Sequence, residues 1–327
     1  MKEIEEEISI RKAICQAIDE EMTRDESVFL LGEEVAQYNG AYKVSEGLWK
    51  KWGGRRIIDT PISESSFTGF AIGAALKGLR PIVEFMSFNF SFVAVDQIAN
   101  RACKMHYMSG GLLHVPIVFR GPNGAANGVS CQHSHSVESF YANFPGLKIV
   151  VPSNSCDAKG LLKSAIRDDN PVIFLENELM YDMMGKVPKK EFLIPFGCAK
   201  IVQEGESATL VTYGRMILPC LEVVTMMQKR GISIELIDLR SIKPIDTETI
   251  FSSVRKTHRV VLVEEGHRFS GINAEISAQI NEHCFDDLDA PVVRVCQLET
   301  PLPYSSVLEA ESIPNAGRIM REMEKIL

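Results

Sequence analysis

Glu64 is the first residue whose type and position suggest chemistry. It lies between an apolar strand pattern at 55–60 and a helix made mostly of small and apolar residues. Ser63 is in position to cap that helix, which puts Glu64 in its first turn. A carboxylate there complements the helix dipole, and position alone favours this structural role. Any catalytic role for Glu64 has to be argued from the rest of the chain.

A glycine-rich stretch, GPNGAANG at 121–128, follows a strand pattern and precedes two histidines. Its backbone N–H groups could cradle a phosphate, but it matches neither the dinucleotide-binding nor the P-loop pattern, which favours a plain surface loop. His133 and His135 lie two residues apart without a third metal ligand nearby, and this disfavours a metal pair. A histidine here can carry a proton near neutral pH. Position alone leaves that role and a structural one equally open.

The helical pattern LLKSAIRDDN must end before Pro171. Its last carbonyls then have no helical partners, and together with Asp168 and Asn170 they could hold a cation through oxygen. A solvated helix end is the more common outcome. Gly69 and Gly73, four residues apart, give another helix one bare face, which suits close packing within the fold or between subunits.

Short apolar runs alternate with helical patterns, and they set where these side chains must lie. The first set is VFLLGEEV, RIIDT, RPIVEF, VPIVFR, LKIVVP and PVIFLE. Such unalternating runs predict a mostly parallel sheet buried on both faces. After the stretch YDMMGKVPKKEFLIPFG, interpreted as a linker, the pattern restarts with ATLVTYG, ISIELIDL, RVVLVEEG and PVVRVCQLE. We predict an α/β fold with domains at 1–187 and 199–327, joined by a linker at 188–198.

Composition excludes several classes of function. A length of 327 residues suits two domains, and 45% hydrophobic with 24% charged residues is typical of a soluble globular protein. The net charge of −8 offers no support for nucleic-acid binding, and no apolar run is long enough to span a membrane. Eight cysteines without a CxxC pair disfavour a zinc site and indicate a reducing compartment. The acidic start, MKEIEEEISIRKAI, is unlike a targeting peptide, so we expect a cytoplasmic, bacterial-type protein.

The order of the motifs resembles a known family. Those that carry the resemblance are LGEEVAQYNGAYKVSEGL, RIIDTPISE, GLRPIVEFMSFNFSF, FRGPNGAANGVSCQHSHS, FPGLKIVVPSN, NPVIFLENELMY, LVTYG and DLRSIKPID. Together they resemble the beta subunits of the pyruvate dehydrogenase component of 2-oxo acid dehydrogenase complexes, among the transketolase-like, thiamine-diphosphate-dependent enzymes. The resemblance spans essentially the whole chain. It implies a thiamine-diphosphate-binding pyrimidine domain with a mostly parallel sheet, followed by a smaller transketolase C-terminal α/β domain.

Carried onto matching positions, the resemblance implies roles for individual residues. Glu64 would grip the aminopyrimidine ring of thiamine diphosphate and favour the tautomer that activates the thiazolium carbon. Phe90 would stack on that ring, while Ile62 and Met86 line its pocket. His133 would transfer protons beside the reacting carbon during decarboxylation or acyl transfer. A structural potassium ion would be held by Ile117, Ala165, Ile166, Asp168 and Asn170.

The resemblance also implies partners. The GDG motif that holds the pyrophosphate through magnesium does not occur in this sequence, so an alpha subunit would supply it in an alpha-2 beta-2 assembly. The acetyl group would pass to the lipoyl domain of dihydrolipoyl acetyltransferase, and the reaction would join glycolysis to acetyl-CoA. Neither a nucleic acid nor a membrane is expected as a partner.

Two features affect the choice of substrate and the behaviour of the site. The motifs ENELMY and PISE favour pyruvate over branched-chain substrates. His135 stands where the common family pattern QHSQ has glutamine, and a second imidazole beside His133 could shift the pH optimum or change lipoyl docking. The alternatives are a branched-chain or other 2-oxo acid dehydrogenase beta subunit, a stand-alone transketolase, and a non-catalytic binding module of the same fold.

Overall fold

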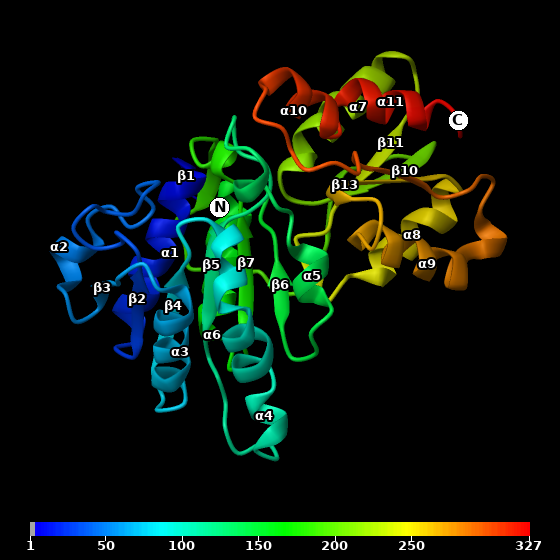
Figure 1. Cartoon of the computed structure of the whole chain (residues 1–327). Coiled ribbons are helices and arrows are strands. Elements are labelled where there is room, and N and C mark those ends of the chain that lie inside the picture. The colour runs from blue at the N-terminus through cyan, green and yellow to red at the C-terminus, as the bar shows by residue number, and fades with distance from the viewer. Residues whose placement is uncertain (1–3) are drawn as a thin grey trace. The chain divides into compact units, whose positions relative to one another are not determined.

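Two compact units make up the chain, and each is built around a sheet of its own (Figure 1). The computed structural model describes residues 4–327. The N-terminal unit comprises Met1–Asn123 and Phe140–Phe196, and the C-terminal unit comprises Gly124–Ser139 and Gly197–Leu327. The segment that carries His133 therefore belongs to the C-terminal unit. The domain boundaries at 187/188 and 198/199 stay a prediction.

The main sheet of the N-terminal unit has the strand order β6-β7-β5-β4-β2-β3, and its neighbouring strands are parallel. Its strands are β2 (Val28–Gly32), β3 (Ile57–Asp59), β4 (Arg80–Glu84), β5 (Val118–Pro122), β6 (Lys148–Val150) and β7 (Val172–Glu176). Each coincides with one of the apolar runs, so the expectation of a mostly parallel sheet is confirmed. Strands β2, β5 and β7 are buried along their whole length, as a sheet covered on both faces requires.

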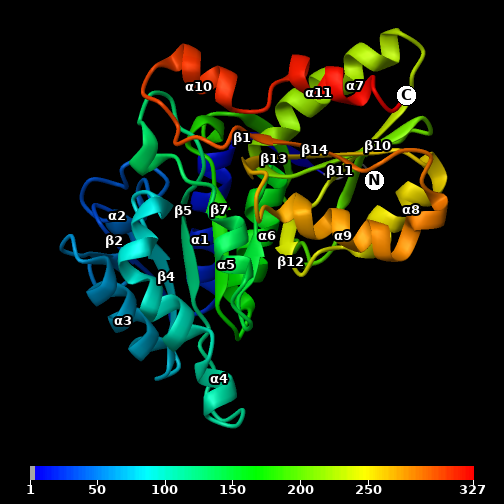
Figure 2. The same cartoon turned by 45° about the vertical axis from the view of Figure 1, so that its right-hand side comes forward.

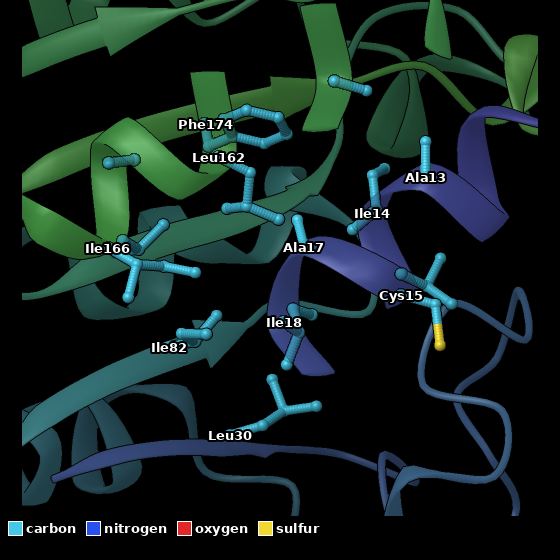
Figure 3. Packing of buried hydrophobic residues seen from close by; sticks show 14 of the residues in the cluster. Ala13, Ile14, Cys15, Ala17, Ile18, Leu30, Ile82, Leu162, Ile166 and Phe174 are labelled. Atoms are coloured by element: carbon cyan, nitrogen blue, oxygen red, sulfur yellow. The ribbon is translucent and has the colours of Figure 1, made fainter. Parts of the chain in front are cut away.

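Two long helices cover one face of this sheet. Helix α1 (Ile10–Arg24) packs along α6 (Ser155–Arg167), and both begin with a side-chain cap, from Ser9 and Asn154. Figure 3 shows the packed side chains, which include Ile14 and Ile18 of α1, Leu162 and Ile166 of α6, and Leu30, Ile82 and Phe174 of the strands. Burying each of these side chains contributes roughly 1.5–3 kcal/mol.

Shorter elements complete the N-terminal unit. Helix α3 (Glu64–Ala75) packs on β4, where Phe67 contacts Phe85 with ring centroids 5.7 Å apart. Gly69 of this helix packs inside the chain, because a Cβ there would lie 3.3 Å from Gln97, whereas Gly73 meets nothing within 4 Å. The remaining helices are α2 (Leu48–Trp52), α4 (Met105–Met108), α5 (Glu138–Ala142), the 3-10 helices Phe88–Ala94 and Glu178–Met180, and a π-helix at Gln97–Ala102.

One strand pair has no counterpart in the sequence prediction. Strand β1 (Glu5–Ser9) pairs antiparallel with β8 (Met184–Pro188), so that Glu5 lies opposite Pro188. The stretch at 181–197, interpreted as a linker, therefore contains a strand, and that interpretation is wrong for β8. Its sequence, MGKVP, has no apolar run or alternation, because the strand depends on backbone bonds to a partner far away in the chain.

The C-terminal unit has a five-stranded sheet in the order β14-β13-β10-β11-β9, with only β9 antiparallel to its neighbour. The strands of this unit are β9 (Lys200–Gln203), β10 (Ala208–Thr212), β11 (Ile234–Asp238), β12 (Ser241–Lys243), β13 (Val260–His267) and β14 (Val293–Gln297). Four of them, β10, β11, β13 and β14, coincide with the predicted runs. The second α/β domain is therefore confirmed.

Helices lie on both faces of this second sheet (Figure 2). Helices α7 (Ile217–Lys229) and α11 (Ala316–Met323) cover one face, and α8 (Thr247–Thr257) and α9 (Ile272–Cys284) cover the other. The unit also contains α10 (Ser306–Ser312) and the 3-10 helices Cys131–His133, Gly214–Met216 and Phe285–Asp287. Over residues 4–327, no helix has the length and apolar character that a membrane span requires. All eight cysteines are free thiols.

Candidate active site

Glu64 begins helix α3, shortly after the carboxyl end of β3. Ser63 occupies the N-cap position as expected, but its hydroxyl donates to Ser66 Oγ (2.8 Å) instead of capping a backbone N–H. The Glu64 side chain is only 8% exposed, and within residues 4–327 its carboxylate makes no hydrogen bond or ion pair. A carboxylate that served only the helix dipole would lose solvation through this burial and gain nothing from it. Glu64 therefore offers a buried acceptor with unused capacity.

A second carboxylate, Glu33, lies close to Glu64 and is not singled out by the sequence analysis. It follows β2, the parallel neighbour of β3, so the carboxyl ends of adjacent strands bring the two side chains together. Burial, followed by the charge of Glu64, raises the pKa of Glu33. Among the described residues its buried Oε1 has no hydrogen-bond partner. Two carboxylates so close together favour a state in which one of them stays protonated, because two negative charges would repel each other. Such pairs are typical of sites that transfer protons.

The loop after β4 carries Met86 and Phe90, both of which are half-buried. Strand β4 pairs in parallel with β2, so this loop leaves the same edge of the sheet as Glu33 and Glu64 do. Ile62, two residues before α3, is 84% exposed. The N-terminal unit thus brings to one sheet edge a buried carboxylate and the side chains expected to line a ring pocket.

A buried ion-pair network fixes the strand ends beneath this loop. Arg120 in β5 pairs with Glu84 at the end of β4 and with Glu176 at the end of β7, and all three side chains are at most 4% exposed. Next to Arg120, a Cβ on Gly121 would lie 2.4 Å from the Phe85 carbonyl oxygen, an approach that only glycine permits. Breaking a buried pair by removing one partner costs roughly 3–5 kcal/mol. The network therefore holds the start of the Met86 loop in place.

His133 lies in the C-terminal unit, at the end of the 3-10 helix Cys131–His133, and its side chain is exposed. Ser130, just before this helix, has φ of 66°, a left-handed conformation that is strained for a residue other than glycine. The Ser130 carbonyl accepts from the Ser134 hydroxyl (2.7 Å) and from the His133 N–H (3.4 Å). These bonds fix the backbone around His133.

The glycine-rich loop before His133 does not offer its N–H groups to a phosphate. They donate inside the protein instead: Asn123 to Glu176 O (2.8 Å), Gly124 to His135 O (2.8 Å), Ala125 to the Glu265 carboxylate, and Gly128 to Glu309 Oε2 (3.1 Å). A donor that is already bonded gains little from a phosphate. The bonded N–H groups agree with a loop that connects elements, but the expected surface position is wrong for residues 121–126, which are buried.

His135 lines a cavity of about 470 Å³ within the C-terminal unit. Although His135 is an exposed residue, partial desolvation of its imidazole is the main cause that lowers its pKa, and the neighbouring imidazoles of His267 and His133 lower it further. His267 is itself oriented, because its Nδ1 lies 3.1 Å from the Leu298 carbonyl oxygen. The cavity is lined by Cys131, Gln132, Ser134, His135, Ser136, His267, Gln297, Glu299, Thr300, Pro301 and Leu302. Its volume suits a small organic group.

The helix end expected to have free carbonyls is occupied by a cation of the chain itself. Helix α6 ends at Arg167, and Arg80 Nη1 donates to the carbonyls of Ile166 and Asp168, at 3.1 Å each. Lys148 pairs with the Asp168 carboxylate, which also accepts from the Asn170 N–H (2.9 Å). The expectation of unpartnered carbonyls is therefore wrong, because a guanidinium from β4 reaches across to them.

The other oxygens expected to bind potassium also accept hydrogen bonds. The Ile117 carbonyl accepts from the Val172 N–H (2.9 Å), and the Ala165 carbonyl accepts from the Asp168 N–H (3.3 Å). A carbonyl oxygen has two lone pairs, so one acceptor position remains at each. Over residues 4–327 no cluster of three or more His, Cys, Asp or Glu side chains could hold a metal ion.

Comparison with known proteins identifies the family. Residues 6–183 match the family model "Transketolase, pyrimidine binding domain", and residues 197–319 match "Transketolase, C-terminal domain". "Pyruvate dehydrogenase E1 component subunit beta, mitochondrial" of Bos taurus is 56% identical over 326 residues, which cover 98% of this chain and 91% of that protein. The proteins of the same name from Homo sapiens (55%) and Dictyostelium discoideum (51%) cover the same shares. The chain belongs to the pyruvate dehydrogenase E1 beta-subunit family.

A solved structure supports the fold of this E1 beta-subunit family member. "Split gene transketolase, inactive beta4 tetramer" aligns with a TM-score of 0.79 over 98% of both chains, at 22% identity. At that identity the likeness speaks for the fold alone. The predicted transketolase-type α/β fold is thereby confirmed, as is the family resemblance inferred from the motifs.

The expected localisation is wrong. The relatives from cattle, human and Dictyostelium are mitochondrial E1 beta subunits, which contradicts the expectation of a cytoplasmic, bacterial-type protein. The expectation rested on the acidic residues that open the sequence. The first residues of a sequence are a poor guide to compartment, because targeting segments are removed from mature proteins.

Proposed function

We propose that this chain is the beta half of a thiamine-diphosphate-dependent pyruvate dehydrogenase. With an alpha subunit, in an alpha-2 beta-2 assembly, it would decarboxylate pyruvate oxidatively and pass the acetyl group to the lipoyl domain of dihydrolipoyl acetyltransferase. The names of its relatives and the pyrimidine-binding family match support this proposal. The observation that carries it is the Glu64 carboxylate, which is buried at a sheet edge without a partner among the described residues.

Glu64 would hold the proton at a ring nitrogen of the cofactor. When bound, thiamine diphosphate supplies the carbanion chemistry that releases carbon dioxide from a 2-oxo acid. A buried carboxylate favours such a proton because it has lost its own solvation and has no competing donor. Glu33 supports this role, since its raised pKa lets it keep a proton beside Glu64 without doubling the negative charge.

Phe90, Met86 and Ile62 would form the apolar walls around that ring. Phe90 offers an aromatic face for stacking, and the exposed Ile62 side chain offers an apolar contact to whatever covers it. Water exclusion by such walls strengthens the interaction between Glu64 and its proton. His133 would hold or release a proton at the reacting carbon or its substituents, and the cavity beside it has room for a small acyl-carrying group.

The two metal ions would have separate holders. Magnesium would be held with the pyrophosphate by the alpha subunit, because this sequence has no GDG motif and its glycine-rich loop has its N–H groups bonded. Potassium would be held by oxygens of Ile117, Ala165, Ile166, Asp168 and Asn170. The remaining lone pairs of these carbonyl oxygens could bind a monovalent cation. The positive charge of Arg80, which donates to the carbonyls of Ile166 and Asp168, opposes binding of the cation.

Two substitutions of Glu64 separate catalysis from helix stabilisation. Glu64→Gln keeps the length of the side chain and removes its charge, whereas Glu64→Asp keeps the charge at the helix N-terminus but withdraws it by one methylene. If Glu64 holds the cofactor proton, both variants should assemble with the alpha subunit and decarboxylate pyruvate at least about a hundredfold more slowly. The measurement is single-turnover decarboxylation at saturating cofactor, so that a binding defect does not count as a chemical one.

A pure helix-dipole role gives the opposite pattern. Glu64→Asp would then behave as the parent does, and Glu64→Gln would lose only about 0.3–1 kcal/mol of stability while keeping its activity. Near-parental single-turnover rates in both variants would therefore refute the proposed role of Glu64.

A further inference from the structure

Two buried carboxylates from distant parts of the sequence hold the loop that leads to His133. Glu265 in β13 accepts a hydrogen bond from the Ala125 N–H, and Glu309 in α10 accepts one from the Gly128 N–H at 3.1 Å. The side chains of Glu265 and Glu309 belong to residues that are only 6% and 8% exposed. All of these residues lie within the C-terminal unit. We call Glu265 and Glu309 together the loop clamp.

The geometry at Gly124 shows how closely the clamp fits. Gly124 has φ of 77°, and a Cβ at this position would lie 2.7 Å from Glu265 Oε1. The loop backbone at Gly124 thus lies in direct contact with the Glu265 carboxylate. A residue with a Cβ would clash with the carboxylate at this position, so the close approach requires glycine. The other carboxylate oxygen of Glu265 lies 3.2 Å from Arg215 Nε, so the carboxylate is held from both sides.

Carboxylates are suited to holding a backbone in one place. A hydrogen bond from N–H to an ionised oxygen is stronger than one between neutral groups, and inside a protein it is screened less by solvent. The clamp holds the loop at positions 125 and 128, five residues or more before His133, and Ser130, with φ of 66°, connects this part of the loop to the 3-10 helix that ends at His133.

We propose that Glu265 and Glu309 are positioning residues for His133. They bind the loop through its backbone and so keep the imidazole in one orientation for proton transfer. This inference rests on the proposed function of His133, because an imidazole without that task would need no fixed orientation. The clamp acts on His133 only through the loop.

The test uses Glu309, because α10 also supplies a matched control. Glu309→Ala removes the acceptor for the Gly128 N–H, Glu309→Gln retains an acceptor oxygen, and Glu311→Ala changes an exposed glutamate on the same helix. Each variant is assembled with the alpha subunit. Hydrogen exchange of the peptides that cover 121–136 is followed by mass spectrometry, and single-turnover decarboxylation and reductive acetylation are measured on the same samples.

The clamp predicts a specific pattern. Glu309→Ala should exchange the Gly128 amide about tenfold faster or more, the expected effect of losing a hydrogen bond to a charged group. Its maximal rate should fall while the pyruvate concentration for half-maximal rate stays near the parental value, and the limb of the pH–rate profile that depends on His133 should move. Glu309→Gln should recover most of the exchange protection and the rate. Glu311→Ala should match the parent in every measurement.

The outcomes that overturn the proposal are distinct from failure of the proposed function. Parental exchange in Glu309→Ala would refute the clamp. If Glu309→Ala exchanges faster but keeps the parental rates and pH profile, the clamp is only a structural contact and the positioning role is refuted. Parental rates in His133→Ala would instead refute the catalytic role of His133. The exchange measurement needs no activity, so it tests the clamp independently of that role. Glu265→Gln, which should loosen Ala125 in the same assay, is an independent second variant, and parental Ala125 exchange there would also refute the clamp.

Discussion

At the scale of single residues, neighbouring side chains decide which groups can hold a proton. Glu64 and Glu33 are ordinary carboxylates in the sequence, but burial and mutual repulsion raise the pKa of Glu33. His135 shows the reverse sign, because burial and two nearby imidazoles disfavour its charged form and lower its pKa. The pair of carboxylates in the N-terminal unit thus favours retention of a proton, whereas the cluster of imidazoles in the C-terminal unit favours loss of one.

The lowered pKa of His135 makes stability depend on acidity. Its ordinary value is 6.5. Below that pH the unfolded chain binds a proton that folded His135 resists, so stability is lost as pH falls from the unfolded pKa towards the folded one. Between about pH 8 and pH 5.5, the parent should lose more free energy of unfolding than His135→Gln does. Denaturant unfolding at several pH values measures this difference.

His135→Asn provides the control, and it should follow His135→Gln across the pH range, because neither amide side chain binds a proton there. Coincident curves for the parent and His135→Gln would show that the surroundings of His135 do not oppose its protonation in the folded chain.

At the scale of elements, helix ends and strand ends position the site. The carboxyl ends of β2, β3 and β4 lead into Glu33, Glu64 and the Met86 loop, and the Arg120 network ties β4, β5 and β7 together below them. The end of α6 is tied to β4 in the same way, because Arg80 bridges from the strand to the helix carbonyls. A cation at that end would therefore strengthen an existing junction between elements.

Potassium binding at the end of α6 predicts a selective gain in stability. Replacing choline chloride with potassium chloride at constant ionic strength should raise the melting temperature. The free energy of unfolding should rise by about 2.7 kcal/mol when the potassium concentration is a hundred times its dissociation constant. Asp168→Asn, which removes a charged ligand, should lose most of this dependence. Asp169→Asn, an exposed neighbour that pairs with Arg80, should keep it. Equal melting temperatures of the parent in both salts would argue against the site.

At the scale of the whole molecule, the proposed function gives the chain one half of a catalytic site. It has the pyrimidine-binding and C-terminal domain matches of its family, and four N–H groups of its glycine-rich loop, those of Asn123, Gly124, Ala125 and Gly128, already donate within the protein. The proposed function assigns the phosphate end of the cofactor to the alpha subunit. This division of labour fits the exposed apolar side chains of Ile62 and Phe70, which a partner subunit could cover.

The purified chain should bind thiamine diphosphate weakly and release no carbon dioxide from pyruvate by itself. Adding the alpha subunit should restore both properties, because the phosphate and magnesium contacts then become available. Calorimetric titration with the cofactor and radiometric release of carbon dioxide measure the two effects. Strong turnover by the isolated chain would contradict the half-site account, and the Glu64→Gln variant serves as the inactive reference in the reconstituted assembly.

The sequence by itself determined the central elements of this protein and its family. Runs such as VFLLG and VIFLE, buried along their whole length, carry the sheet signal locally, and the order of the motifs sufficed to nominate Glu64 and His133. The sequence did not predict strands β1, β8, β9 and β12, because they are short or half-exposed and have little local apolar pattern. Their strand conformation depends on backbone bonding to partners elsewhere in the chain.

Only the tertiary structure decided the surroundings of the nominated residues. No local pattern shows that Glu33 lies beside Glu64, that Arg80 occupies the end of α6, or that Glu265 grips a loop 140 positions earlier in the chain. Burial, hydrogen-bond partners and shifted pKa values arise when residues distant in sequence share one low-dielectric space. Residue type and order are properties of the sequence, whereas the environment that determines the role of a carboxylate forms only when the chain folds and packs.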